Sequence, residues 1–430
     1  MTQDTVARWT VVDDRRPRLG APSTSPGNDS AVERRDHLMN TAEGHMKFGM
    51  FMAPMHNSVQ NPTLALQRDL ELIQRLDQLG YDEVWIGEHH SAGSELVASP
   101  EVFIAAAAER TKHIKLGTGV VSLPYHHPLW VADRAMLLDH LTRGRFMLGV
   151  GPGSLPTDSA MIGIEPAVLR PRLEEGLQAV LHLLSSDEPL TMETDWFTLK
   201  DAVLQMRPYT RPRIEMAVPG VVSPTGAKLA GKHGIGLLTI GAAAGEGIDT
   251  FAQHWNIVEE QAEEHGQVAD RATWRVMTMV HLAATEEQAR KDVAFGIADF
   301  FRYFQHVAAF PQFAVQGENV DEMIDFINDN GLGVIGTPEM FVELMQKWQD
   351  QSGGFGTCML LHHEFADPDA TLRSHQLLAR LVMPEFQGQA ASLRAAKERA
   401  SRSREGLVSK SQAAVDAMTE KYAADRAGRA

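Results

Sequence analysis

One pattern recurs along most of this chain: a short apolar run, typical of a buried strand, is followed by a segment with helical periodicity. The first unit joins KFGMFMA to a helix predicted over 61–80. The apolar positions of that helix share one face: Leu66, Leu70, Ile73 and Leu76. Further strand-like runs are DEVWIGE, IKLGTGVVSL, RFMLGVG, RIEMAVPG, IGLLTIG, WRVMTMVHLA and GFGTCMLLHHEF. Strands that alternate with helices form a parallel sheet, and about eight units predict a single (β/α)8 TIM barrel with insertions.

The segments outside this alternation differ in composition. Residues 1–45 are rich in Asp, Arg, Ser, Pro and Gly, which predicts a disordered extension. The barrel is expected over 46–387, with a short hairpin in WFTLKDAVLQM. Residues 305–335 interrupt the pattern and are expected to form a lid or entrance over the barrel mouth. Residues 388–430 are charged and alanine-rich, which predicts a helical or disordered tail.

Charge and cysteine content narrow the classes of partner. Lys and Arg number 40 against 56 Asp and Glu, and the resulting net charge of −16 disfavours nucleic acid and anionic membranes. Cys358 is the only cysteine, so no disulfide forms within the chain. No run has the pattern of a signal peptide or the length of a membrane-spanning helix. These features predict a soluble, cytoplasmic protein.

Polar residues gather at the ends of the predicted strands, where barrels of this kind carry their active sites. Five clusters follow strands: Glu88-His89-His90, Tyr125-His126-His127, Gly151-Pro152-Gly153-Ser154, Ser223-Pro224-Thr225-Gly226 and His362-His363-Glu364. The barrel mouth is therefore the expected functional site.

The three His-His pairs raise the question of a metal site. Consecutive strand residues point to opposite faces, so one pair does not readily send both rings to one ion. One histidine from each of three strands remains an alternative arrangement. We predict no metal site, and we interpret His362 and His363 as structural. His89 is the predicted catalytic residue, because an imidazole at a barrel mouth carries protons near neutral pH.

Two further clusters have properties that suit a bound ligand. Ser223 is predicted to cap a helix whose first residue is Pro224, and the free amides there suit an anion such as phosphate. An ordinary capped helix is the alternative interpretation. Gly151 and Gly153 allow a ligand to approach the backbone closely, although neither a Walker loop nor a Rossmann fingerprint is present.

The pocket at the barrel mouth is expected to be apolar. Five apolar side chains fall near predicted strand ends: Phe51, Met52, Met55, Val120 and Leu123. A mouth with few charges suits a hydrophobic substrate.

As an ordered set, these stretches resemble the bacterial luciferase-like flavin-dependent monooxygenases. The motifs that carry the resemblance are MKFGMF, GYDEVWIGEHH, IKLGTGVVSLPYHHP, RGRFMLGVGPG, EMAVPGVVSPTGAKLAGKHG and the terminal SGGFGTCMLLHHEFADPDATLRSHQLLARLVMPEF. They span roughly residues 46–387. Within that family, NPTLALQRDLELI, EHHSAG and SLPYHHP look most like limonene-monooxygenase-type sequences.

The resemblance implies a two-component enzyme that receives reduced FMN from a separate NAD(P)H:flavin reductase. It uses O2 to oxygenate a small hydrophobic substrate, such as a monoterpene, and relatives suggest a homo-oligomer. An alkene would give an epoxide and a ketone an ester, and the sequence does not choose between them. Exclusion of water from the site is the main task of the protein in such chemistry.

The family's site residues map onto particular positions here. His89 matches a histidine near the reactive face of the flavin, and Glu88 beside it is placed among the cofactor-binding residues. The remaining positions that the resemblance implies for cofactor binding are Gly119 and Val120 at a non-proline cis peptide, Gly151 and Gly153 in a loop past the flavin, and Ser223, Thr225 and Gly226 at the phosphate. Pro152 departs from the family, because luciferase has a phosphate-binding arginine there.

Three other functions stay open. A deazaflavin-dependent oxidoreductase on the same barrel would transfer hydride without oxygen. A metal-dependent hydrolase would need inward-facing histidines. A non-catalytic protein would bind FMN without coupled oxygen consumption.

Overall fold

The computed structural model describes residues 45–53, 55–221, 223–239, 249–308, 317 and 319–428. The extension predicted as disordered, 1–45, lies outside the described residues except for residue 45. Its predicted disorder therefore stays a prediction.

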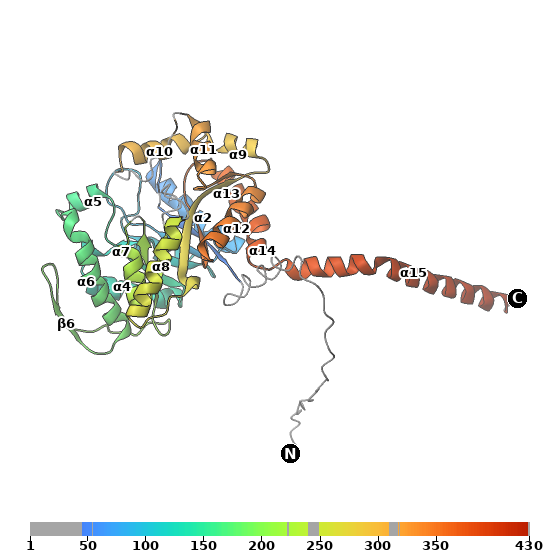
Figure 1. Cartoon of the computed structure of the whole chain (residues 1–430), viewed down its shortest axis with the longest axis horizontal. Coiled ribbons are helices and arrows are strands. Elements are labelled where there is room, and N and C mark those ends of the chain that lie inside the picture. Colours follow the sequence, from blue (N-terminus) through green and yellow to red (C-terminus); the bar gives the residue numbers. More distant parts are fainter. Residues whose placement is uncertain are drawn as a thin grey trace, which may run out of the picture. The chain divides into compact units, whose positions relative to one another are not determined.

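Eight parallel strands close into a ring, which confirms the predicted barrel (Figure 1). In order around the ring they are β1 (Lys47–Met52), β2 (Glu83–Ile86), β3 (Lys115–Thr118), β5 (Phe146–Gly151), β8 (Glu215–Gly220), β9 (Gly236–Thr239), β10 (Trp274–Leu282) and β12 (Thr357–Leu361). The first and last strands meet with Lys47 opposite Thr357, so the two ends of the barrel sequence lie side by side. All eight ring strands were predicted from their apolar runs.

Two further strands extend this sheet. Val121–Ser122 (β4) continues the third strand beyond a break and pairs with β5, while Gly333–Gly336 (β11) pairs with the second half of β10. The short β11 was not predicted, and it lies within the segment expected to form a lid. Of that segment, the structure describes the end of α10 (Ile297–His306), α11 (Val320–Asp329) and β11, and residues 309–316 and 318 lie outside the description.

Helices follow the strands along the chain, and most of them cover the outside of the barrel (Figure 1). They are α2 (Pro62–Leu79), α3 (Pro100–Ala108), α4 (Pro128–Thr142), α5 (Pro156–Met161), α6 (Pro166–Ser185), α7 (Thr225–His233), α8 (Asp249–Glu264), α9 (Glu286–Val293), α12 (Pro338–Ser352), α13 (Pro368–Leu377), α14 (Met383–Phe386) and α15 (Ala391–Ala427). The predicted ends of α2 are confirmed: Asn61 accepts bonds from the first turn, and Gly80 ends the helix at φ 83°.

The hairpin lies earlier than predicted. It joins β6 (Leu190–Glu193) to β7 (Thr198–Ala202), so Trp196 and Phe197 belong to the turn rather than to a strand. The backbone N–H of Thr194 donates to the Phe197 carbonyl at 3.0 Å. The two aromatic residues have high strand propensity, but in the turn Phe197 is buried and the Trp196 indole bonds Glu175.

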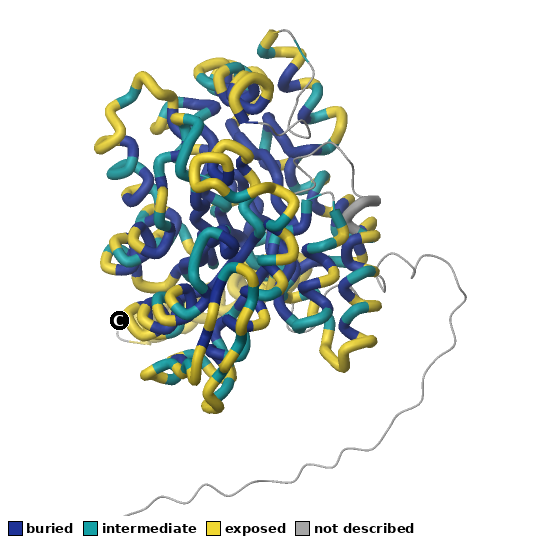
Figure 2. The backbone as a smooth tube through the Cα atoms, turned by 90° about the vertical axis from the view of Figure 1, so that its left-hand side faces the viewer, coloured by how far each residue is buried: buried dark blue, intermediate teal, exposed yellow. Residues whose placement is uncertain are grey.

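Buried segments fill the centre of the molecule (Figure 2). Their apolar side chains form two clusters, one between the strands and the surrounding helices and one that runs from the inside of the barrel to α9, α10 and α11. Inside the barrel, a fully buried guanidinium lies near the strand starts: Arg275 donates to Glu83 at 2.6 and 3.0 Å and also to Glu215. It lies 4.8 Å from the Trp85 ring centre. The two carboxylates outweigh the cost of burial and raise the pKa of Arg275. Arg275 is therefore a charged residue of the core whose hydrogen bonds are satisfied.

The C-terminal helix α15 has no buried residue, and its charged, alanine-rich sequence is helical as expected. Among the described residues, no helix combines the length and the apolar character needed to cross a bilayer.

Candidate active site

His89, the predicted catalytic residue, lies just beyond β2 between two carboxylates. Its Nδ1 is 3.0 Å from Asp158 Oδ2, and its Nε2 is 3.0 Å from Glu95 Oε2. Asp158 belongs to α5, whereas Glu95 follows His89 in the same loop. The Tyr303 hydroxyl of α10 donates to the other Glu95 oxygen at 3.3 Å. One loop and two helices therefore hold one imidazole ring.

These neighbours set the charge of His89. Burial opposes protonation, but the Glu95 and Asp158 carboxylates outweigh it and raise the pKa of His89 to about 10. The sequence led us to expect a ring that exchanges protons near neutral pH. The pairing instead holds an imidazolium between two carboxylates: Nδ1–H bonds Asp158, and Nε2 lies within ion-pair distance of Glu95, so the positive charge is fixed in place.

Glu88 forms the centre of a second group of contacts. Its Oε1 accepts from His126 at 2.6 Å and from His90 at 2.9 Å, and its Oε2 accepts from the Ser122 N–H at 2.7 Å. Burial opposes ionisation, yet these hydrogen bonds lower the pKa of Glu88 to about 2. Glu88 is thus an ionised, buried anchor that joins the ends of β2 and β4.

The peptide bond between Gly119 and Val120 is cis, as the resemblance implied. A Cβ on Gly119 would lie 2.8 Å from Trp85 Cβ, so a side chain has no room there. Val120 in turn approaches Gly151, where a Cβ would lie 2.6 Å from Val120 Cγ2 and 3.2 Å from Pro219 Cγ. The predicted positions on β3, β5 and β8 therefore meet at one edge of the barrel mouth.

The loop after β5 lies against a buried polar atom that has no hydrogen-bond partner in the described chain. Tyr125 Oη has no hydrogen bond within the described chain, and burial raises the pKa of Tyr125 to about 12. A Cβ on Gly153, which has φ 83°, would lie 2.3 Å from that oxygen. An orphaned hydroxyl beside a glycine loop suits a ligand that supplies the missing partner.

The turn before α7 differs in detail from the prediction. Ser223 does not cap the helix: α7 starts at Thr225, Pro224 occupies the capping position, and no side chain bonds the first amides. Gly226 packs against the end of β8, because a Cβ there would lie 2.0 Å from the Pro219 carbonyl oxygen. The first-turn N–H groups of α7 thus remain available to an anion, with the Ser223 and Thr225 hydroxyls beside them.

The apolar residues expected at the pocket divide into two sets. Met52 and Leu123 are fully buried in the core outside the barrel, so the expectation that they line the mouth is wrong. Met52 lies on the helix-facing side of β1 because neighbouring strand residues alternate, whereas Leu123 follows β4 and packs against Gly176 of α6. Phe51, Met55 and Val120 belong to the inner cluster, and Met55 lines an open cavity of about 1040 Å³.

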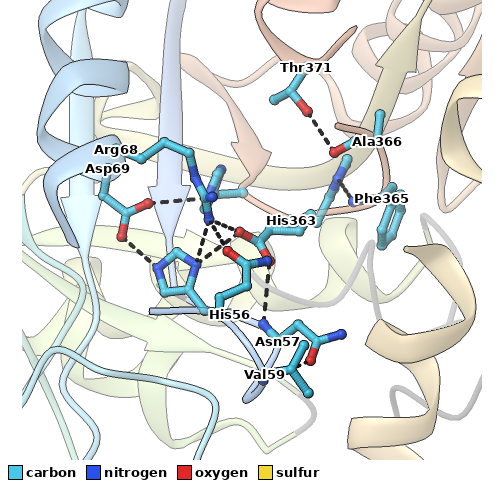
Figure 3. Close-up of polar contacts among 12 residues, drawn as sticks. His56, Asn57, Val59, Arg68, Asp69, His363, Phe365, Ala366 and Thr371 are labelled. Atoms are coloured by element: carbon cyan, nitrogen blue, oxygen red, sulfur yellow. Dashed lines mark hydrogen bonds and ion pairs between the residues drawn. The ribbon is translucent and has the colours of Figure 1, made fainter. Parts of the chain in front are cut away.

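That cavity lies between the β1–α2 loop, α10 and the β12–α13 loop. On its wall, His56 Nε2 lies 2.8 Å from Asp69 Oδ2, and His56 Nδ1 lies 3.0 Å from Glu364 Oε1 (Figure 3). Burial opposes protonation, but these two carboxylates raise the pKa of His56 to about 9. Arg68 bonds the same Glu364 carboxylate. We call His56, Arg68, Asp69 and Glu364 the His56 cluster.

The pair at the end of β12 behaves as predicted for structural histidines. Burial lowers the pKa of both His362 and His363, so both rings are neutral. His363 stacks on Phe365 at 3.6 Å and contacts the Val280 carbonyl at 3.2 Å. In the described part of the chain, no three His, Cys, Asp or Glu side chains are grouped so that they could hold a metal ion.

The sequence did not reveal Glu95, Asp158, Tyr303 or His56 as site residues. Each lies in a loop or a helix that follows a strand, without any local motif, and only the closed barrel brings it to the mouth. The available signal was position: acidic residues directly after β2 and β5 fall at the catalytic end of the barrel.

Known proteins share this sequence and fold. A family model described as luciferase-like monooxygenase matches residues 46–353. Over 345 residues the chain is 50% identical to limonene 1,2-monooxygenase of Rhodococcus erythropolis, covering 80% of this chain and 88% of that protein. It is 44% identical to 4-hydroxyprotoasukamycin monooxygenase of Streptomyces nodosus subsp. asukaensis, covering 80% and 93%.

A solved structure agrees with this assignment. The oxygenating constituent of 3,6-diketocamphane monooxygenase from Pseudomonas putida, a type II Baeyer–Villiger monooxygenase solved with FMN, superimposes with a TM-score of 0.69 at 25% identity and covers 79% of this chain and 98% of that one. The chain therefore belongs to the luciferase-like monooxygenase family and is a monooxygenase built on a TIM barrel.

Proposed function

We propose that this enzyme binds reduced FMN, delivered by a separate NAD(P)H:flavin reductase, and oxygenates a small hydrophobic substrate with O2. A monoterpene such as limonene is the first candidate, because a relative at 50% identity bears the name of that reaction. The observation that carries the proposal is the imidazolium of His89, fixed between Glu95 and Asp158 at the barrel mouth.

The residues present fit a flavin mononucleotide. The first-turn amides of α7, with Ser223 and Thr225, would hold the phosphate, and Gly226 allows the turn to pack closely. Because Pro152 replaces the family's arginine, these neutral donors would carry the phosphate contact. Gly151 and Gly153 let the backbone pack directly against Val120 and the Tyr125 hydroxyl, and a bound FMN would give that hydroxyl a partner.

The ring system of the cofactor would lie against the Gly119–Val120 peptide, where the backbone approaches without a side chain. Bound reduced FMN supplies the activation of O2, and the chain supplies the surroundings. The fixed charge of His89 would stabilise negative charge that develops nearby, which is worth most where water is excluded. Glu88 would act indirectly, by holding His90 and His126 in position.

An isotope experiment tests the reaction class. Enzyme, reduced FMN and limonene are mixed under labelled O2, and the product is examined by mass spectrometry. A monooxygenase gives a product with one labelled atom, with the second atom in water. An unlabelled product, or no reduced-FMN binding in an anaerobic titration, would refute the proposal. A deazaflavin that co-purifies with the protein would favour hydride transfer instead.

The assembly is part of the same proposal. We expect a homo-oligomer and a reductase that delivers FMN by diffusion, in the cytoplasm. Light scattering of the purified chain tests the first, and product formation with an unrelated reductase tests the second.

A further inference from the structure

The cavity beside the His56 cluster has two unlike walls. Leu72, Phe300 and Tyr303 give it an apolar side, whereas the His56 cluster forms a charged side. Tyr303 also bonds Glu95, which contacts His89. A molecule in this cavity would therefore lie beside Tyr303, and Tyr303 would connect it through Glu95 to the His89 imidazolium.

Arg68 retains unused donors on the charged wall. Its hydrogen bonds within the described residues start from Nη2, which donates to Glu364 and, at 3.0 Å, to Gln60 Oε1; His56 Nδ1 lies 3.3 Å from the same nitrogen, but it carries a proton directed at Glu364 and accepts no bond. Its Nη1 and Nε have no partner in that part of the chain, and a third of its side chain is exposed to the cavity (32%). A guanidinium held by one carboxylate thus presents further N–H groups in a fixed plane.

The charge around Arg68 limits what can accept those bonds. The two cations of the His56 cluster, Arg68 and His56, are balanced by its two anions, Asp69 and Glu364. The rim carries three acidic and two basic residues: Glu71, Asp299, Asp369, Arg75 and Arg302. An anionic ligand would give this balanced wall a net negative charge, whereas a neutral oxygen accepts the bonds without that cost.

The size of the cavity also bears on its ligand. Its volume of about 1040 Å³ is at the upper end of the ~300–1,000 Å³ range of pockets for drug-sized ligands. It accommodates more than a ten-carbon hydrocarbon, and a pure hydrocarbon leaves the donors of Arg68 without a partner.

We propose that this cavity binds the organic substrate and selects one with an apolar body and a neutral oxygen acceptor, such as a carbonyl, amide or hydroxyl, which Arg68 recognises. The inference rests on the proposed function only in that the ligand is the substrate of the reaction. The preference for an oxygen acceptor can be tested by binding alone.

The test compares three probes that share one carbon skeleton: limonene, its ring ketone carvone, and perillate, in which a carboxylate replaces the ring methyl group. Equilibrium binding to the full-length wild-type chain is measured at neutral pH without flavin. We expect carvone to bind about tenfold more tightly than limonene, as one hydrogen bond to a charged donor provides. We expect perillate to bind no more tightly than carvone.

Three variants connect this preference to Arg68. Arg68→Met should bring the carvone-to-limonene affinity ratio to about one. Arg68→Lys keeps the ion pair with Glu364 but loses the planar fork, so it should lose most of the preference even if the methionine variant folds poorly. Arg75→Met is the matched control, because Arg75 lines the same cavity from the same helix but, within the described residues, bonds only Gln78. It should keep the wild-type ratio.

The possible results separate clearly. Equal wild-type affinities for carvone and limonene, a ratio that survives in both Arg68 variants, or an equal loss in Arg75→Met would overturn the inference. Perillate as the tightest ligand would show an anion site instead. If the preference appears but labelled oxygen enters neither limonene nor carvone, the proposed function fails while the acceptor site stands.

Discussion

Replacing Glu95 by glutamine removes one of the two charges that hold His89 protonated. In the wild type the pKa of His89 is raised from 6.5 to about 10. That difference corresponds to roughly 5 kcal/mol at ~1.4 kcal/mol for each tenfold change in proton affinity. Two carboxylates at equal distances of 3.0 Å share it. Because the two carboxylates also offset the cost of burial, which remains in the variant, Glu95→Gln should remove at least about half of that difference and lower the proton affinity of the ring by about 50-fold or more.

The assay is a pH titration of histidine ring signals by NMR, with His89 assigned by its loss in His89→Gln. Glu101→Gln is the matched control, since Glu101 is also a buried carboxylate near the barrel mouth but pairs with Arg134. We expect the His89 titration to move to lower pH in Glu95→Gln and to stay in Glu101→Gln. A wild-type ring that titrates near 6.5, or an unchanged titration in Glu95→Gln, would refute the reasoning.

The same pairing makes a contribution to stability that depends on pH. The pKa of His89 is higher in the folded protein than its ordinary value, so the protonated ring stabilises the native state fully below pH 6.5. This stabilisation is lost as the pH rises from 6.5 through about 10. The free energy of unfolding should fall across that window in the wild type and fall less in Glu95→Gln.

Three further changes test the site and the core. His89→Ala should leave reduced-FMN affinity near the wild-type value but lower product formation by about 100-fold or more; unchanged product formation would contradict its assigned role. Gly226→Ala places a Cβ 2.0 Å from the Pro219 carbonyl oxygen, so α7 must shift, and an anaerobic titration should show weaker FMN binding. Arg275→Met leaves Glu83 buried without its cation and should lower the free energy of unfolding in urea by ~3–5 kcal/mol; a smaller loss would show that water replaces the guanidinium.

A matched glycine change controls the second of these tests. Gly406→Ala lies in α15, where no atom comes within 4 Å of the added Cβ. It should leave FMN binding unchanged. Equal weakening in both variants would show that close packing at Gly226 is not the cause.

The ring of strands could be predicted from the sequence because each ring strand is an apolar run bounded by helical segments. The prediction of strands failed at two places: one strand was too short to be recognised, and one aromatic pair was assigned to a strand although it lies in a turn. Gly333–Gly336 has four residues and two glycines, so it carries too little strand signal. Trp196 and Phe197 have high strand propensity, yet their turn is set by packing.

The candidate site could also be predicted only in part. His89, the Gly119–Val120 bond and Gly226 fall in local motifs, and the structure places them at the mouth. The partners of His89 could not be predicted, because Asp158 lies 69 residues away and meets the ring only after the barrel closes. The raised pKa of His89 follows from those partners, so its ordinary pKa, on which the expected proton exchange near neutral pH rested, could not reveal it.

The His56 cluster also has a consequence for how the protein is made. His56 and Glu364 lie 308 residues apart in the chain. At ~5–20 residues per second, the ribosome takes roughly 15–60 s to cover that distance. During this interval β1 has no partner on its β12 side, and the buried charge of His56 lacks one of its two carboxylates. A nascent chain stalled before β12 thus exposes an open strand edge, which makes it a natural client for chaperones that shield such edges.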